Sequence, residues 1–188
     1  MSDNSLSKEI EIKAYVRDFD YVLNYLYNNA KFKKKYFKKD IYYARENEIK
    51  SNDIRFENCI RLRVQNGGYT FCSKKRSIID GVEVNDEREV KVSKKKARFI
   101  INFLSSLQGY KELVRKEKRG YSFSYKGTII DLSHVKGLDD FIEIEFLDSK
   151  LSQESQIEEL KTLLSELSIS EADIEAEAYM TLLMKNNK

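Results

Sequence analysis

Residues 9–13 read Glu9-Ile10-Glu11-Ile12-Lys13, a strict alternation of charged and apolar side chains. Successive side chains of a β-strand point to opposite faces, so this stretch predicts a strand with three charges on one face. The same alternation returns around Arg61-Leu62-Arg63 and around Glu143-Ile144-Glu145. A sheet built from such strands has one apolar face and one charged face, and this property decides the fold.

Helix and turn signals place the other elements between these strands. Asp18 is a helix cap before an apolar stripe, and Asn66-Gly67-Gly68 and Asp80-Gly81 are hairpin turns. The predicted elements after the first strand are a helix from Asp18, a strand ending at 40–43, a hairpin over 59–76, a second hairpin turning at Asp80-Gly81, a helix over 94–107, strands over about 113–132 and 140–147, a helix from Ser152 and a last helix capped by Ser170 with Asp173. This order predicts an α+β chain with an antiparallel sheet large enough to curl.

The composition limits the class of protein. The 188 residues carry 34 Lys+Arg and 31 Asp+Glu, so 35% of the chain is charged while the net charge is only +3. This balance argues against a partner such as nucleic acid and against an acidic disordered tail. Length and the scarcity of Gly and Pro predict one domain over residues 1–188.

Two further features concern the compartment. Cys59 and Cys72 are too few for a disulfide scaffold, and packing is the expected role of both thiols. The chain shows neither a signal peptide nor an apolar run that spans a bilayer, so a cytoplasmic protein without a membrane partner is expected.

Like charges recur two residues apart on the predicted strands. The pairs are Glu9/Glu11, Arg61/Arg63, Glu87/Glu89, Lys116/Lys118 and Glu143/Glu145. Such side chains lie roughly 7 Å apart on one face and repel unless opposite charge lies near them. A solvated sheet face explains any single pair. Five pairs on one curved sheet favour a site in which basic rows bind phosphates and carboxylates bind a hard divalent cation.

Six elements in order also resemble the CYTH superfamily of triphosphate tunnel enzymes, and most closely its class IV adenylate cyclases. They are Glu9-Ile10-Glu11-Ile12-Lys13, Lys39-Asp40-Ile41-Tyr42, Arg61-Leu62-Arg63 with Lys74, Lys116-x-Lys118-x-x-Tyr121, the segment from Val135-Lys136-Gly137-Leu138 to Glu145, and Tyr179 with Leu182-Leu183. The resemblance covers about residues 8–184. It implies a closed antiparallel eight-stranded β-barrel, a triphosphate tunnel, with its charged faces inward and helices packed outside.

The resemblance also implies roles for individual residues. Metal ligands for Mg²⁺ or Mn²⁺ are expected at Glu9, Glu11, Asp131, Glu143 and Glu145. Triphosphate ligands are expected at Lys13, Arg61, Arg63, Lys74, Lys116 and Lys118. Further tunnel candidates are Asp40, Tyr42, Arg76, Glu87, Glu89 and Arg119.

The sequence departs from the family pattern at several positions. Asp131 lies farther from the Val-x-Gly-Leu motif than the family's metal-binding Asp, which leaves Ser133 as the alternative for that position. Lys118 stands where the family has Arg, which keeps the charge and loses the bidentate fork. Asp139 replaces the usual Gly, and Glu87 and Glu89 compete for one register.

The resemblance leaves more than one reaction open. The first expectation is a class IV-type adenylate cyclase that converts ATP to cyclic AMP and pyrophosphate, and the main alternative is an inorganic or organic, thiamine-type, triphosphatase. A remote alternative is a non-catalytic nucleotide-, polyphosphate- or RNA-binding module, because residues 31–39 interleave lysines with aromatic residues. His134 is expected to have a loop role. The tail helices are expected to cover the core, with a homodimer left open.

Overall fold

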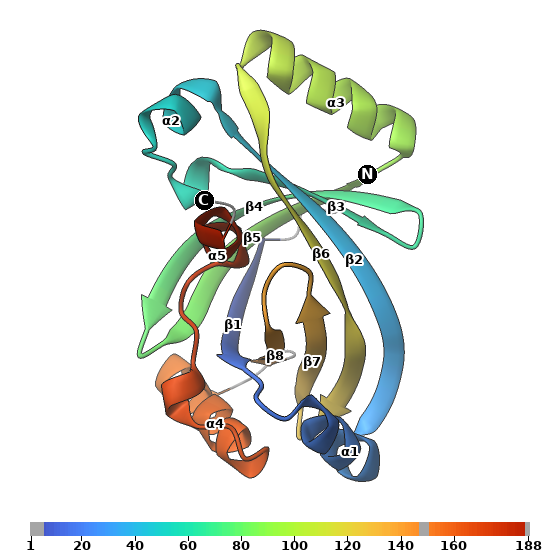
Figure 1. Cartoon of the computed structure of the whole chain (residues 1–188), viewed down its shortest axis with the longest axis vertical. Helices are drawn as coiled ribbons and strands as arrows, with labels where there is room; N and C mark the ends of the chain where they lie inside the picture. Colours follow the sequence, from blue (N-terminus) through green and yellow to red (C-terminus); the bar gives the residue numbers. More distant parts are fainter. Residues whose placement is uncertain (1–5, 147–150, 187–188) are drawn as a thin grey trace.

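The fold is a closed barrel of eight antiparallel strands with five α-helices outside it (Figure 1). The computed structural model describes residues 6–146 and 151–186. The strands follow one another around the barrel in the order β1-β5-β4-β3-β2-β6-β7-β8, and β8 closes the ring on β1. Their bounds are β1 Leu6–Tyr15, β2 Lys31–Arg45, β3 Ile60–Gln65, β4 Gly68–Ile79, β5 Val82–Val92, β6 Tyr110–Tyr125, β7 Thr128–Val135 and β8 Asp140–Phe146.

The helices interrupt the strands at three places and then end the chain. Their bounds are α1 Phe19–Asn29, α2 Glu46–Ser51, α3 Lys94–Leu107, α4 Gln153–Glu166 and α5 Tyr179–Asn186, with 3₁₀ turns η1 Phe56–Asn58 and η2 Glu171–Asp173. Asp18 caps α1 as predicted, because its Oδ1 accepts a 2.9 Å hydrogen bond from the Tyr21 amide.

Both predicted hairpins are confirmed, and the turn residues explain them. Asn66 and Gly67 have φ of 50° and 76°, and Asp80 and Gly81 have φ of 50° and 81°. Two consecutive residues with positive φ form the turn that matches the twist of the flanking strands, and Asn-Gly and Asp-Gly adopt it at low cost. The turns therefore fix the registers β3–β4 and β4–β5.

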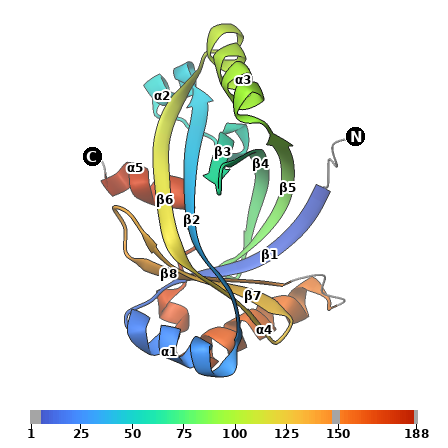
Figure 2. The same cartoon turned by 90° about the vertical axis from the view of Figure 1, so that its right-hand side faces the viewer.

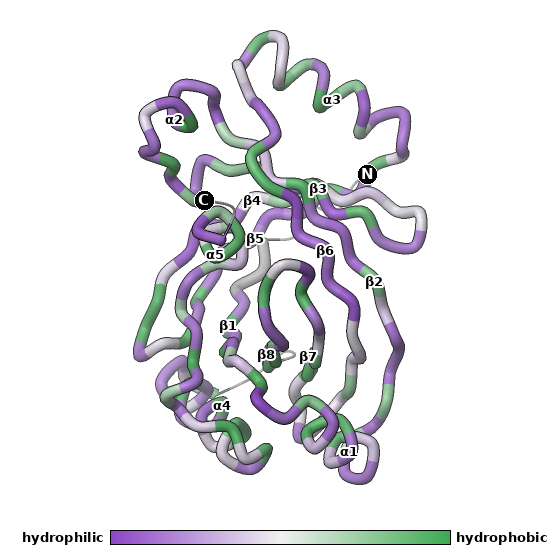
Figure 3. The backbone as a smooth tube through the Cα atoms, viewed as in Figure 1, coloured by the Kyte–Doolittle hydropathy of each residue, from purple (hydrophilic) through white to green (hydrophobic). Residues whose placement is uncertain are grey.

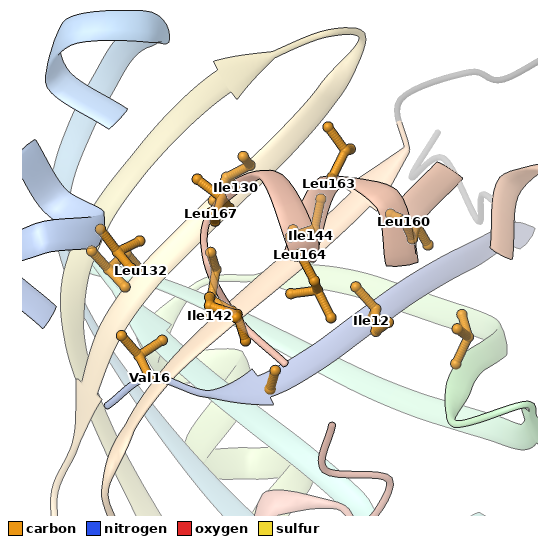
Figure 4. Close-up of a cluster of buried hydrophobic side chains, with 14 of the residues drawn as sticks. Ile12, Val16, Ile130, Leu132, Ile142, Ile144, Leu160, Leu163, Leu164 and Leu167 are labelled. Atoms are coloured by element: carbon orange, nitrogen blue, oxygen red, sulfur yellow. The ribbon is translucent and has the colours of Figure 1, made fainter. Parts of the chain in front are cut away.

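The apolar faces of the strands point outward, toward helices. In β1, Ile10 and Ile12 belong to a buried cluster that includes β7, β8 and the α4 residues Leu160 and Leu164 (Figure 4). Figure 2 shows α1 and α4 side by side under this part of the barrel. The main hydrophobic core therefore lies between the barrel wall and these helices.

Two other helices, α3 and α5, pack on other parts of the barrel. The inner side of α3 packs Ala97 and Leu104 against Leu62 and Phe71 of β3 and β4. Tyr179, in the first turn of α5, packs in a smaller cluster with barrel residues of β7 and β8. Hydrophilic and hydrophobic positions are interspersed along the strands (Figure 3), although β6 also carries an unbroken charged run at residues 115–119.

The structure corrects the prediction for the C-terminal tail. Ser170 caps only the short turn η2 by accepting from the Ala172 amide, and no longer helix follows at that point. The Asp173 carboxylate binds the Arg17 guanidinium instead of serving a capping box, and Ile174 forms a β-bridge with Ala14. These contacts hold the chain extended until α5 begins at Tyr179. The end of the predicted strand at Leu147 lies outside the described residues.

The structure also describes the two cysteines and the length of the helices. Cys59 and Cys72 are both buried free thiols. Within residues 6–146 and 151–186, no helix combines the length and the apolar character that crossing a membrane requires.

Gly120 marks a close approach of β6 to β7 that tests this architecture. A Cβ atom there would lie 2.2 Å from the Leu132 carbonyl oxygen and 2.8 Å from the Ser133 Cα, both of them backbone atoms. We expect Gly120→Ala to lower the free energy of unfolding by about 3 kcal/mol in urea denaturation, because the two strands must move apart. Gly68→Ala is the control, since its nearest contact would be 3.3 Å. Equal stability of the two variants would contradict this packing.

Candidate active site in the barrel interior

The inward side chains of the strands line a cavity of about 260 Å³. Fifteen of its twenty lining residues are charged. The cationic ones are Lys13, Lys38, Arg61, Arg63, Lys74, Lys116 and Lys118, and the acidic ones are Glu9, Glu11, Glu83, Glu87, Glu89, Asp131, Glu143 and Glu145. Seven basic and eight acidic side chains thus face one another around one cavity.

The cavity brings together nearly all of the residues predicted from the sequence. All five expected carboxylate ligands and all six expected phosphate ligands line it, and so do Tyr42, Glu87 and Glu89. Asp40 lies below the lining, and Arg76 binds Glu83 and the Ala176 carbonyl at one edge. Their roles in binding stay predictions.

Arg119 is a correction to the predicted site. It is exposed on the outer face of β6, where it borders a separate surface hollow beside Phe37 and His134. The reason is the two-residue period of the strand: Lys116 and Lys118 point inward, so Arg119 points outward. Tyr121 of the same motif also lies on the outer face, near Tyr27 and Phe19 of α1.

Asp40 is a buried carboxylate that holds two of the cations in place. Its Oδ1 and Oδ2 accept hydrogen bonds of 2.8 and 3.0 Å from the Arg63 guanidinium, and its Oδ2 lies 3.0 Å from Lys116 Nζ. Burial alone raises the pKa of Asp40, but the Lys116 and Arg63 charges outweigh it and hold the pKa well below its usual range. Asp40 is therefore ionised and orients both cations toward the cavity.

Glu87 has the corresponding position on the other wall. Its carboxylate binds Arg61, lies 2.8 Å from Lys74 Nζ and accepts a hydrogen bond from the Cys72 thiol. Although burial raises the pKa of Glu87, the neighbouring Arg61 and Lys74 charges lower it overall. Glu89 lies farther out, 3.4 Å from Arg61. Of the two residues that compete for one position, Glu87 thus lies deeper, and both carboxylates face the cavity.

A second group of carboxylates lacks enough cations. Burial, together with nearby carboxylates and despite Lys74, raises the pKa of Glu9 and of Glu11 to about 7. Glu145, which pairs with Glu11 across β1 and β8, also has a raised pKa through burial and the Asp131 charge. Carboxylate oxygens with raised pKa values are donors that a hard divalent cation stabilises, so the donor chemistry of these residues fits Mg²⁺ or Mn²⁺. Among the described residues, the group whose ligand atoms all lie within 4.8 Å of one another is instead Cys72, Glu87 and Glu89, so the expected ligands would have to move together to hold a cation.

Asp131 and Ser133 have different environments on the inner face of β7. Asp131 lines the cavity, pairs with Glu143 on β8 and accepts a 2.8 Å hydrogen bond from Lys38 Nζ. Ser133 is fully buried beside Gly120, and its hydroxyl is 3.5 Å from the Phe141 carbonyl. Of the two alternatives, Asp131 is the one whose side chain reaches the cavity.

Six residues of the lining were not among the predicted site residues: Lys38, Phe56, Glu83, Ile129, Ala178 and Tyr179. Lys38 binds Asp131, Glu83 lies 3.6 Å from Lys13 and binds Arg76, and Tyr179 carries Lys13 and Lys116 over its ring at 4.6 Å. Strand periodicity could have found Lys38 and Glu83, because Lys38 shares a face with Asp40 and Glu83 shares one with Glu87. Tyr179 belongs to the last element of the family resemblance, but no local pattern around it predicts that its ring enters the barrel end.

Comparisons with known proteins show the fold. Neither a protein-family model nor a curated protein matches the chain. Among solved structures, a Pyrococcus horikoshii protein is 27% identical with a TM-score of 0.76, over 94% of this chain and 98% of its own. A candidate adenylate cyclase from Vibrio parahaemolyticus is 19% identical with a TM-score of 0.76, over 95% and 99% of the two chains. A Hippeastrum protein, described as a candidate adenylyl cyclase that reveals a dominant triphosphatase activity, is 14% identical with a TM-score of 0.63, over 100% and 97%.

The arrangement around Asp40 predicts a large loss of stability on neutralisation. Asp40→Asn keeps the shape but leaves Arg63 and Lys116 without their buried counter-charge, so we expect the free energy of unfolding to fall by about 3 kcal/mol in urea denaturation. Glu112→Gln is the control because its pair with Arg115 is exposed, and its stability is expected to change little. A tolerated Asp40→Asn change would show that the pair of cations needs no counter-charge there.

The raised pKa values predict a pH effect on the metal-free protein. Glu9 and Glu11 lose their protons near pH 4.5 when unfolded and near pH 7 when folded. The folded state therefore binds more protons in this window, and the free energy of unfolding falls as the pH rises through it. Unfolding in EDTA at pH 5 and pH 8 measures the fall.

The control for this experiment removes the titrating groups. Glu9→Gln combined with Glu11→Gln is expected to flatten the pH dependence, and Mn²⁺ is expected to stabilise the parent protein at pH 8 more than at pH 5, because protons and cations compete for the same oxygens. An unchanged fall in the double variant would assign the effect to other groups.

Proposed function

We propose, from the premise that this chain has the CYTH-like triphosphate tunnel fold, that it is a metal-dependent enzyme acting on a triphosphate, and that its reaction is the cyclisation of ATP to cyclic AMP and pyrophosphate. The observation that carries the proposal is the cavity of the barrel, where seven basic side chains face eight acidic ones. A solvated sheet face would explain any single pair of like charges, but it does not explain why so many opposite charges gather around one cavity.

The ion pairs of the cavity support a binding mode in which its lysines exchange carboxylate partners for the oxygens of a triphosphate. Lys74 is bound to Glu9 at 2.9 Å, Lys38 to Asp131 at 2.8 Å, and Lys118 to Glu143. When a triphosphate enters, its oxygens replace the carboxylates as partners of the lysines. The released carboxylates of Glu9, Glu11, Asp131, Glu143 and Glu145 would hold Mg²⁺ or Mn²⁺, which neutralises charge on the phosphate oxygens when bound.

The protein's own part in the reaction is then positioning and charge stabilisation. In the cyclisation, a bond forms between the ribose 3′ oxygen and the α-phosphorus, the bond from that phosphorus to the bridging oxygen breaks, pyrophosphate leaves, and the proton of the 3′ hydroxyl passes to solvent. In this proposal, Arg61 and Arg63, which are held by Glu87 and Asp40, would stabilise the negative charge of the leaving group. No covalent intermediate with the protein is required.

Two segments support the cyclase in preference to other triphosphate reactions. Lys39-Asp40-Ile41-Tyr42 and the stretch from Lys116 to Tyr121 carry the resemblance to class IV cyclases, and the structure joins them through the ion pair of Asp40 with Lys116. Tyr42 lines the cavity beside Arg61. The Vibrio parahaemolyticus protein of the same fold is itself described as a candidate adenylate cyclase.

A triphosphatase is the second candidate, and the lining itself favours it. Only Tyr42, Phe56, Ile129, Ala178 and Tyr179 are uncharged in the described lining, which offers a nucleoside base little apolar surface. In that reaction water attacks the terminal phosphorus, the bond from that phosphorus to the bridging oxygen breaks, and the diphosphate part of the substrate leaves, while the attacked group becomes orthophosphate. The Hippeastrum protein of this fold, described as having a dominant triphosphatase activity, supports the same alternative.

Product analysis separates the two reactions. With ATP and Mn²⁺, the cyclase proposal predicts cyclic AMP and pyrophosphate in equal amounts by nucleotide chromatography. The matched substrate is 3′-deoxy-ATP, which lacks the attacking hydroxyl and is expected to give no product. Release of orthophosphate from both nucleotides, without cyclic AMP, would replace the cyclase by the triphosphatase.

Substitution tests the carboxylates in either reaction. Glu9→Gln combined with Glu11→Gln is expected to reduce turnover at least 100-fold, because removal of buried ligands loses the cation that the site needs. Asp86→Asn, on the exposed side of β5, is the control and is expected to retain activity. Full turnover in the double variant would overturn the proposed metal site.

A further inference from the structure

A second hollow, of about 320 Å³, lies beside the cavity at the end of the barrel where β3 turns into β4. Its lining includes the basic side chains of Lys34, Arg63 and Lys91, and the part of the chain that the structure describes contributes no acidic side chain to it. We call this hollow the basic mouth. Arg63 also lines the cavity, so the two spaces adjoin at this residue.

The strands place these cations along a path that leads into the cavity. Thr70 of β4 pairs with Arg63 on one side and with Lys91 on the other, so the three residues form one row across three strands. On β2, Lys34 and Lys38 lie four residues apart and share the inner face, because side chains of a strand alternate. Lys34 lines the basic mouth, and Lys38 lines the cavity.

Lys34 and Lys91 differ from the lysines of the cavity in their partners. Both are exposed, and neither forms an ion pair within residues 6–146 and 151–186. Inside the cavity, Lys38, Lys74 and Lys118 are each bound to a carboxylate. An anion therefore gains Lys34 and Lys91 without displacing a carboxylate, whereas binding inside the cavity requires that exchange.

The charges of the cavity alone offer an anion little attraction from a distance. Its seven basic and eight acidic side chains nearly cancel when no metal ion is bound. A triphosphate carries several negative charges, and a hollow of the opposite sign raises the local concentration of such a ligand. The basic mouth is such a hollow, since Lys34 and Lys91 add positive charge that no carboxylate of its described lining offsets.

The end of the cavity around Lys13 is covered by the segment that leads into α5. The Glu177 carbonyl accepts a hydrogen bond from Lys13 Nζ, and the Ala176 carbonyl accepts one from Arg76. Tyr179 is buried there, with Lys13 Nζ 4.6 Å from the centre of its ring. Figure 1 shows α5 and the β3–β4 turn on opposite sides of β2 and β6. The covered end therefore leaves the side of the basic mouth for access to the cavity.

We propose that the basic mouth is an entry subsite, where Lys34 and Lys91 bind the phosphate chain of a triphosphate before its oxygens reach Arg63 and the cavity. This inference rests on the proposed function, because it requires that the cavity binds a triphosphate. The ligand chemistry is the phosphate chain itself, which ATP and inorganic tripolyphosphate share. The subsite raises the association rate and leaves the dissociation rate nearly unchanged, because its contacts form before those of the cavity.

Stopped-flow binding of a fluorescent ATP analogue with Mg²⁺ tests the entry subsite. Lys34→Gln combined with Lys91→Gln is expected to lower the association rate constant about tenfold at low ionic strength and to make it less dependent on salt. Lys75→Gln combined with Lys111→Gln is the matched control, because it removes the same charge from two exposed lysines that line neither the cavity nor the basic mouth. The control is expected to bind like the parent protein.

Calorimetric titration with inorganic tripolyphosphate separates the phosphate chain from the nucleoside. The double variant at Lys34 and Lys91 is expected to bind tripolyphosphate about tenfold more weakly than the parent protein, because the same charges attract this ligand. Equal association rates in the two double variants, or a loss confined to the ATP analogue, would overturn the entry subsite, while triphosphate binding by the parent protein would still support the proposed function. A parent protein that binds neither ligand would overturn the proposed function itself.

Discussion

Charges enclosed in a closed barrel must neutralise one another, and the rest of this structure depends on that constraint. Removal of an ion from water costs several kcal/mol, so each inward cation needs a carboxylate within contact distance. Asp40 serves Arg63 and Lys116, and Glu87 serves Arg61 and Lys74. The barrel thus presents cations to a ligand without leaving them unpaired in its absence.

The carboxylates of the cavity are not equally neutralised by cations, and this difference separates them into two groups. Asp40 and Glu87 have lowered pKa values, whereas Glu9 and Glu11 have raised values because burial and neighbouring carboxylates act on them together. The first group supports fixed cations, and the second group gains by binding a divalent one. The folded state is stabilised mainly outside the barrel, where α4 and α1 bury the apolar faces of the strands.

The period of a strand predicted which charged residues share a face, the family resemblance implied their roles, and the errors came from not applying that period everywhere. It predicted that Glu9, Glu11 and Lys13 share the inner face. The same rule, counted from Lys116 and Lys118, excludes Arg119 from the cavity. Counted from Asp40, it places Lys38 on the inner face. The tail could not be predicted in this way, because Asp173 looks like part of a capping box until Arg17 is seen to bind it.

The sequence by itself determined which side chains share a face, where the hairpins turn and which helices carry apolar stripes, because these properties depend on residues a few positions apart. The tertiary structure decided which faces meet. Lys74 finds Glu9 across β4 and β1, and Tyr179 reaches Lys13 from the far end of the chain. Such partners are set by closure of the barrel, in which β8 pairs with β1. These strand pairs join residues that are far apart in the sequence, and no local pattern of residues predicts such pairs.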